Sequence, residues 1–405
     1  MREFLVVIAS FLIIPVLSRR KVPIGISICA CALIMAIAGG IGPDAFIGII
    51  LNTFFNPNKL QQFIIVSEVA VIGVLLKKYK IIDELLGHLT RVFSSNRLLL
   101  MFIPALIGML IVPGGAMMSA PLIDQLGEKS NLTKSHRAII NLIYRHISMH
   151  IMPYATGFLI VMSLAPQISI YKLMLLNSIF VIMYVVAGYF LYIRRVQNHK
   201  ASEHIFCWGN LFSFFKLSSP IYVAVLLNLM LGVPFYMGML ANLLVLFLLR
   251  PTETFLVDAA KAFNFNVLYA LIGVYLIQGI IGSMEELTLF LTLVFSNPST
   301  VMLGIIASSF FFGITTGYQP TALGVVLPIL ITLPLSDNQL LLYCHFTFMW
   351  GFVGYFFSPM HLCQLFTCEY LQVPTADLYR EYWKFFVSLV IILVLNYFVM
   401  GFFLI

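Results

Sequence analysis

Two stretches decide how this chain folds, VPGGAMMSAP at 112–121 and TTGYQPTALGVVLP at 315–328. Each lies in an apolar segment where an uninterrupted helix would be expected, and each is broken near its centre by Gly and Pro. Inside lipid, backbone that leaves helical geometry needs protein or water to satisfy its polar groups. Each stretch therefore predicts either a kinked transmembrane span or a re-entrant hairpin, the hairpins covering about 98–126 and about 300–335.

The rest of the sequence places both stretches in a membrane. Of 405 residues, 61% are hydrophobic and 10% are charged, and the mean hydropathy is +1.01, whereas soluble domains carry about 25% charged residues. The apolar run at the N-terminus lacks a small-residue cleavage site and is followed by Arg19, Arg20 and Lys21, so it predicts a first transmembrane helix rather than a signal peptide. The net charge of +7 comes from basic residues at the ends of apolar runs, so no nucleic-acid binding is expected.

The positive-inside rule separates the two interpretations, because they place later loops on opposite sides of the membrane. If both stretches are hairpins and the N-terminus is outside, 19 of the 23 Lys and Arg residues face the cytoplasm. If both are full spans, the basic residues divide 11 against 11, and Arg145 lies within a span in either case. The hairpin interpretation is therefore favoured, with both termini outside.

A repeat supports the same arrangement. DELLGHLTRVFSS at 83–95 aligns with EELTLFLTLVFSN at 285–297 at an offset of 202, with seven of thirteen positions identical, and the same offset brings Gly115 onto Gly317. Each half then has five full spans and one hairpin, and because five is odd the second half must enter from the opposite side. We predict an all-α polytopic membrane protein with about ten transmembrane helices, two re-entrant hairpins and two inverted repeats, which are 1–202 and 203–405.

The stretch after the first hairpin carries the strongest functional signal. HRAIINLIYRHISMHIMPYA, at 136–155, places four polar residues in one apolar helix, namely Asn141, Arg145, His146 and His150. Pro153 is expected to interrupt that helix. An unpaired arginine near mid-membrane costs at least ~3 kcal/mol on insertion scales. Arg145 therefore needs either a carboxylate partner, for which Glu68 is the candidate, or an anionic ligand.

The second half repeats the broken helix. LYCHFTFMWGFVGYFFSPMHLCQLFTCEYL, at 342–371, is interrupted at Ser358 and Pro359, with His361 just beyond. Where a broken helix restarts, its free N–H groups suit an anion, and the carbonyls that end the other half suit a cation. The alternative is a Gly/Pro kink that packs on a neighbouring helix.

Three residue types have competing interpretations. Glu68 is acidic near the middle of a span, which suits proton coupling or a structural ion pair with Arg145 or a histidine. The HxxxH spacing of His146 and His150 could bind zinc, but it lacks the glutamate of HExxH, so no metal is expected. The six cysteines, Cys363 among them, have no paired CxxC spacing and are interpreted as small core residues.

With PGGAMMSAP, RHxxxHxMP and SPMHLC in view, nearly the whole chain resembles an uncharacterised family of prokaryotic integral membrane proteins. That family is grouped with the ion transporter superfamily of citrate, gluconate and dicarboxylate carriers. The resemblance implies a homodimer in the plasma (inner) membrane that works by an elevator-like mechanism, with a scaffold at 1–80 and 219–283 and a mobile transport part at 98–193 and 300–405. Sodium-coupled dicarboxylate members use Ser-Asn-Thr triplets, and this chain has none at its breaks.

These observations favour a secondary active transporter of a small, carboxylate-like organic anion, coupled to Na⁺ or H⁺, with no other cofactor and no catalytic residues. A metal-dependent intramembrane enzyme and a channel or structural subunit are the alternatives. Glu68 and His146 are the candidates for proton coupling. The expected substrate site comprises the hairpin tips and the helix breaks, namely Gly114, Gly115, Ser119, Asn141, Arg145, His146, His150, Pro153, Thr316, Gly317, Gln319, Thr321, Ser358, Pro359 and His361.

Overall fold

The structure is a computed structural model that describes residues 2–20, 22–93, 95–109, 115–197 and 207–404. The described residues form helices and no strand, which confirms the all-α prediction. The first half contains α1 (Arg2–Phe11), α2 (Ile13–Arg19), α3 (Ile24–Gly39), α4 (Pro43–Phe55), α5 (Pro57–Lys78), α6 (Ile81–Val92), α7 (Asn96–Gly108), α8 (Gly115–Lys129), α9 (Lys134–Arg145), α10 (Ser148–Ile151), α11 (Thr156–Leu164) and α12 (Ile170–Gly188), which continues as η1 (Tyr189–Ile193).

The second half is also helical where the structure describes it. It contains α13 (Trp208–Leu231), α14 (Phe235–Leu249), α15 (Phe255–Lys261), α16 (Phe265–Gly282), α17 (Glu285–Ser296), α18 (Val301–Thr316), α19 (Pro320–Leu330), α20 (Asp337–Phe356), α21 (Leu362–Leu371) and α22 (Thr375–Leu404). Six helical segments of the described chain are long and apolar enough to cross a membrane. The chain is thus a membrane-embedded helical protein, while the total of about ten spans stays a prediction.

The helices that flank the Gly/Pro stretches are short. α7, α18 and α19 are apolar but have only 10 to 17 residues, and none is among the six candidate spans. α7 packs against α8, and α18 packs against α19. Two short packed helices joined at a Gly/Pro stretch are the arrangement expected of a hairpin that does not cross the bilayer.

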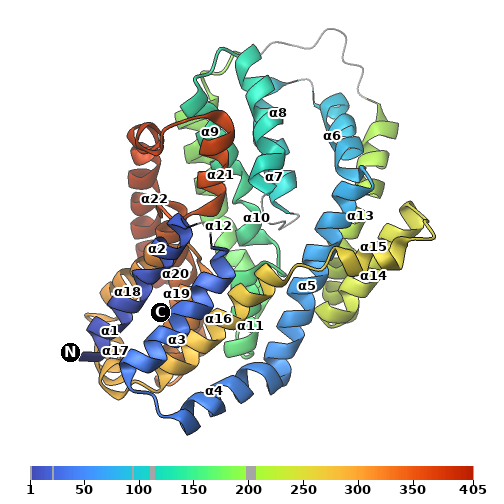
Figure 1. Cartoon of the computed structure of the whole chain (residues 1–405). Coiled ribbons are helices and arrows are strands. Elements are labelled where there is room, and N and C mark those ends of the chain that lie inside the picture. Colours follow the sequence, from blue (N-terminus) through green and yellow to red (C-terminus); the bar gives the residue numbers. More distant parts are fainter. Residues whose placement is uncertain (1, 21, 94, 110–114, 198–206, 405) are drawn as a thin grey trace.

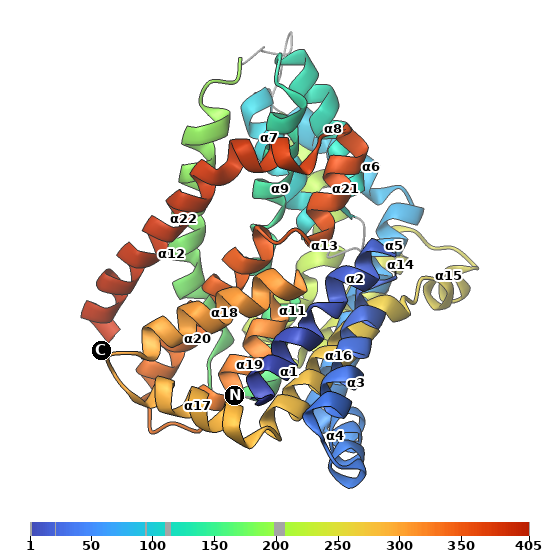
Figure 2. The ribbon, with the colours of Figure 1, turned by 60° about the vertical axis from the view of Figure 1, so that its left-hand side comes forward.

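The two halves exchange contacts reciprocally. α8 of the first half packs against α21 of the second, and α19 of the second half packs against α11 of the first. In the same way α3 packs on α16 while α14 packs on α5, and α12 contacts α22 (Figure 2). Such an exchange is expected of two related halves, and the inversion of the second half stays a prediction.

The helices also separate into two groups. In Figure 1, α5, α6, α13 and α14 lie to the right of α7, α8, α9 and α22. α13 and α14 pack on each other and on α6 and α5, whereas α9 packs on α7, α8, α21 and α22.

Both predicted helix breaks are present. α10 ends at Ile151 and α11 begins at Thr156, with Pro153 in the interruption. α20 ends at Phe356 and α21 begins at Leu362, with Ser358 and Pro359 between them. Proline has no backbone N–H to donate and its ring crowds the preceding turn, which favours an interruption at each of these positions.

Polar side chains satisfy the backbone that the second break frees. The Ser358 hydroxyl donates to the Ile314 carbonyl at 2.6 Å and accepts from the Met360 N–H at 3.1 Å. The Tyr379 hydroxyl donates to the Phe357 carbonyl at 2.9 Å. Irregular backbone at membrane depth requires partners of this kind.

Candidate functional site

Arg145 ends α9 and is held between the two helices of the first Gly/Pro stretch. A Cβ atom at Gly115, the first residue of α8, would lie 2.3 Å from Nη2 of Arg145. A Cβ atom at Gly108, the last residue of α7, would lie 2.1 Å from the Arg145 carbonyl oxygen. Gly108 therefore requires glycine, because the neighbouring atom is backbone, whereas a side chain at Gly115 would displace the flexible end of Arg145. Gly114 lies outside the described residues.

The guanidinium of Arg145 is buried and pairs with no acidic residue in the described ranges of the chain. Only 6% of the residue is exposed, and its Nη1 makes no hydrogen bond. Within the described part of the chain no Asp or Glu pairs with it, and the ion pair with Glu68 that was one alternative is not formed. A buried charge without a counter-charge is costly.

His146 follows Arg145 directly and meets His361 from the other half. Their Nε2 atoms lie 3.0 Å apart. Nδ1 of His146 lies 2.6 Å from the Leu142 carbonyl oxygen, and Nδ1 of His361 lies 3.1 Å from the Phe356 carbonyl oxygen. The helix break at Ser358 and Pro359 turns His361 towards the first half, so the site depends on both halves.

Cys363 completes this cluster, and the sequence interpretation missed it. Its Sγ and one nitrogen of each of His146 and His361 all lie within 4.8 Å of one another. The hydroxyl of Tyr355 is 3.2 Å from Nε2 of His146. The sequence signal for this pair is the HLC spacing of SPMHLC, whereas the lack of a paired CxxC spacing favoured a core role for Cys363.

Asn141 connects three helices on the other side of Arg145. Its Nδ2 donates to Oγ1 of Thr367 on α21 at 3.0 Å and to the Ala116 carbonyl on α8 at 3.4 Å. Its Oδ1 has no partner although the residue is fully buried. The Ser119 hydroxyl bonds only within its own helix, to the carbonyls of Gly115 and Ala116.

Of the residues at the second Gly/Pro stretch, Gly317 lies against the second helix break. It caps α18 with φ +59°, and a Cβ there would lie 2.7 Å from Cβ of Met360. The Gln319 Nε2 donates to the Phe348 carbonyl at 3.0 Å, while its Oε1 has no partner. The Thr316 hydroxyl donates to the Phe312 carbonyl of its own helix at 2.6 Å, and the buried Oγ1 of Thr321 has no partner.

His150 and Glu68 are not part of the Arg145 cluster. The His150 ring is enclosed by aromatic rings, the nearest being Phe352 at 4.3 Å between centroids, and neither ring nitrogen has a hydrogen-bond partner. Glu68 lies on α5, is half-buried, and its Oε2 also has no partner. The zinc pair of His146 and His150 that the HxxxH spacing allowed is therefore not the pair that the fold brings together.

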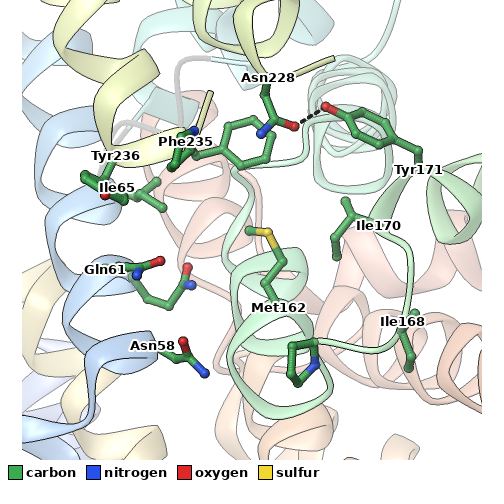
Figure 3. Close-up of a pocket in the computed structure, with 13 residues that line it drawn as sticks. Asn58, Gln61, Ile65, Met162, Ile168, Ile170, Tyr171, Asn228, Phe235 and Tyr236 are labelled. Atoms are coloured by element: carbon green, nitrogen blue, oxygen red, sulfur yellow. Dashed lines mark hydrogen bonds between the residues drawn. The ribbon is translucent and has the colours of Figure 1, made fainter. Parts of the chain in front are cut away.

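A polar cavity of about 370 Å³ lies elsewhere, between α5, the segment joining α11 to α12, and the turn between α13 and α14 (Figure 3). Its polar lining comes from Asn58, Gln61, Gln62, Tyr171, Asn228 and Tyr236. Figure 3 shows the Tyr171 hydroxyl bonded to Asn228, while Oε1 of the buried Gln62 has no partner. No pattern in the sequence had indicated this cavity.

Apolar helices that enclose an unpaired arginine and a cluster of imidazoles define a polytopic membrane protein with a polar interior site. A family model described as "Protein of unknown function (DUF401)" matches residues 4–403, and the chain belongs to this family. No curated protein matches the chain.

Proposed function

We propose that this protein is a secondary active transporter of a small, carboxylate-like organic anion. The observation that carries the proposal is Arg145, a buried guanidinium in a membrane protein with no acidic partner among the described residues. α21 begins at Leu362 next to this cluster, and the first N–H groups of a helix have no intrahelical partner and carry partial positive charge. A carboxylate would accept hydrogen bonds from both groups.

The grouping of the helices supports alternating access with a scaffold at 1–80 and 219–283 and a transport part at 98–193 and 300–405. The polar cavity lies where these two parts meet, because α5, α13 and α14 line one side and α11 and α12 the other. An apolar cavity of about 570 Å³ lies between α6 and α13 on one side and α7, α10 and α12 on the other. Loose packing along this boundary is what an elevator-like displacement requires.

For coupling we propose H⁺ or Na⁺, with Glu68 as the proton carrier in the first case. Glu68 lies on α5 between the polar cavity, which α5 lines with residues 58 to 65, and a smaller one that begins at Val69. Its carboxylate makes no ion pair among the described residues, so it is free to take up and release a proton. The contacts of His146 favour another role, which is described below.

The orientation and assembly are part of the same proposal. We place the protein in the plasma membrane of a prokaryote as a homodimer with both termini outside, on the distribution of basic residues and the family resemblance. Figures 1 and 2 support this orientation, because both termini lie in the lower half of the view and the C-terminal end of α8, with Lys129, lies at the top.

Uptake into proteoliposomes tests the proposal. A panel of mono-, di- and tricarboxylates is offered under a proton gradient or a sodium gradient, and we expect saturable, gradient-driven uptake of at least one of them. Arg145→Ala should abolish uptake while the protein stays folded, and the control Arg91→Ala, an exposed arginine on α6, should leave it unchanged. Uptake by Arg145→Ala at the unmodified rate would remove Arg145 from the site, and non-saturable flux would indicate a channel.

A further inference from the structure

The histidine pair between the two halves has an unusual hydrogen-bond pattern. Nδ1 of each ring lies within hydrogen-bonding distance of a backbone carbonyl, which can only accept. Each ring must therefore carry its proton on Nδ1 to make that bond. A neutral imidazole has only one such proton. Each Nε2 atom then carries a lone pair and no proton, and the two Nε2 atoms lie 3.0 Å apart.

Two lone pairs at this distance repel each other unless a cation lies between them. We propose that His146, His361 and Cys363 form a binding site for a transition-metal ion that accepts nitrogen and sulfur ligands, with Zn²⁺ as the ion. The proposal goes beyond anion transport and does not depend on it.

The identity of the three ligands favours a metal over a shared proton. A proton between the imidazoles would need no third group, whereas the Cys363 sulfur lies within 4.8 Å of both nitrogens. Histidine nitrogen and cysteine sulfur are the ligands that zinc prefers, and a site with three protein ligands keeps a fourth position open. The Tyr355 hydroxyl, 3.2 Å from Nε2 of His146, is next to the cluster.

The surroundings of the two rings are those of metal ligands. A zinc-bound histidine almost always donates its other N–H to a carbonyl or carboxylate, which fixes its tautomer and orientation. Leu142 and Phe356 supply those carbonyls here, and both belong to helices that end at the site. With Zn–N bonds of ~2.0 Å in a tetrahedral site, the nitrogens would lie about 3.3 Å apart. The pair needs to open by only a few tenths of an ångström.

A metal ion at this site would be shielded from water and would change the charge of the site. His361 is fully buried and His146 is 2% exposed, so the ion would be shielded from water. Binding would release the Cys363 thiol proton to solvent, leaving one net positive charge on the Zn²⁺–thiolate unit. That charge would add to the positive charge of Arg145, which directly precedes the ligand His146 in the chain.

Cobalt binding to the purified full-length protein in detergent tests the site. After treatment with a chelator, Co²⁺ is titrated and the absorption spectrum recorded. We expect one Co²⁺ per chain, with a thiolate-to-cobalt charge-transfer band, and displacement of Co²⁺ by Zn²⁺. Cys363→Ser should bind Co²⁺ without that band, and His361→Ala should bind it at least about tenfold more weakly.

Two controls make the result decisive. Cys368→Ser changes another buried cysteine of α21, and His88→Ala changes a histidine of α6. Both residues lie outside the cluster, so both variants should bind Co²⁺ as the unmodified protein does. Thermal unfolding of each variant verifies that it is folded. A folded protein that binds no Co²⁺, or a charge-transfer band that persists in Cys363→Ser, overturns the proposal. Anion uptake is measured separately, so either proposal can fail without the other.

Discussion

Each half has a helix crossing at which a glycine lies against a backbone carbonyl, and a different residue supplies that carbonyl in each half. In the first half, a Cβ at Gly108 would lie 2.1 Å from the carbonyl oxygen of Arg145; in the second, a Cβ at Gly313 would lie 2.3 Å from the carbonyl oxygen of Gly351. The same backbone contact thus carries a buried cation in one half and a glycine in the other. The close contact is present in both halves, and the buried charge is present at only one of these two crossings.

The residues that follow Arg145 and Gly351 also differ between the halves. His146 and His150 follow Arg145 by one and five residues, and Phe352 and Phe356 follow Gly351 by the same intervals. The aromatic residues of the second half pack on the histidines of the first, with Phe352 4.3 Å from His150 between ring centroids. The second half therefore lines the site with aromatic side chains. Its own candidate metal ligands, His361 and Cys363, come only after its helix break.

The largest expected effect comes from breaking the contact that the halves share. Gly108→Val and Gly313→Val each force a side chain against a backbone carbonyl at little more than 2 Å, where no flexible atom can yield. We expect neither variant to give folded protein, a loss of more than ~3 kcal/mol. Yield and gel-filtration profile measure this. Gly87→Val, at a helical glycine with open space around it, is the control, and a well-folded Gly313→Val would contradict the close contact between Gly313 and the Gly351 carbonyl.

A large effect of opposite sign is expected where the halves differ. Arg145→Met replaces the arginine with an uncharged side chain of similar length. The crossing in the second half likewise has no charge, because Gly351 supplies the carbonyl there. We expect the free energy of unfolding to rise by up to about 3 kcal/mol, and the stabilisation by carboxylate ligands to vanish. Thermal unfolding with and without ligand measures both. A less stable variant would mean that Arg145 is neutralised by a group within the protein.

His150 gives a smaller and more local test. Its two ring nitrogens have no partner inside an aromatic enclosure, and Phe356 lies at the same interval after Gly351 as His150 does after Arg145. Replacing a buried, unsatisfied polar group with an apolar one of similar volume removes its desolvation cost, so His150→Leu should stabilise the protein by about 1 kcal/mol. The change in unfolding midpoint measures it, with His136→Leu, at a partly exposed and hydrogen-bonded histidine, as the destabilised comparison.

These contrasts show what the sequence could predict. Proline and glycine act through the local backbone, so the helix breaks at Pro153 and at Ser358 and Pro359 followed from the sequence alone. The neighbours of a side chain depend instead on the crossing of distant helices, so the pairing of His146 with His361 and Cys363 could not be predicted from the HxxxH spacing.

The smallest expected effect concerns the ion pair of Lys78 and Asp258, which lies outside the two helix breaks. Arg145, by contrast, pairs with no acidic residue in the described part of the chain. Nζ of Lys78 lies 2.5 Å from a carboxylate oxygen of Asp258 on α15, and Tyr79 and Thr254 donate to the other oxygen at 3.0 and 3.1 Å. The hydrogen bond from Lys78, followed by those from Tyr79 and Thr254, lowers the pKa of the Asp258 carboxyl.

A carboxyl whose pKa is lowered by folding stabilises the protein above its unfolded pKa, about 3.9 for Asp, and loses that stabilisation as the pH falls through the folded value. Asp258→Asn should therefore lower the unfolding midpoint slightly at neutral pH and leave the protein less sensitive to pH below about 4. Added salt should reduce the difference, because Lys78 is half-exposed and its charge is screened. The exposed neighbour Glu253, changed to Gln, is the control. Equal acid sensitivity in Asp258→Asn and the unmodified protein would show that this pair contributes nothing, and the only charge that matters to stability in this comparison would then be the unpaired one at Arg145.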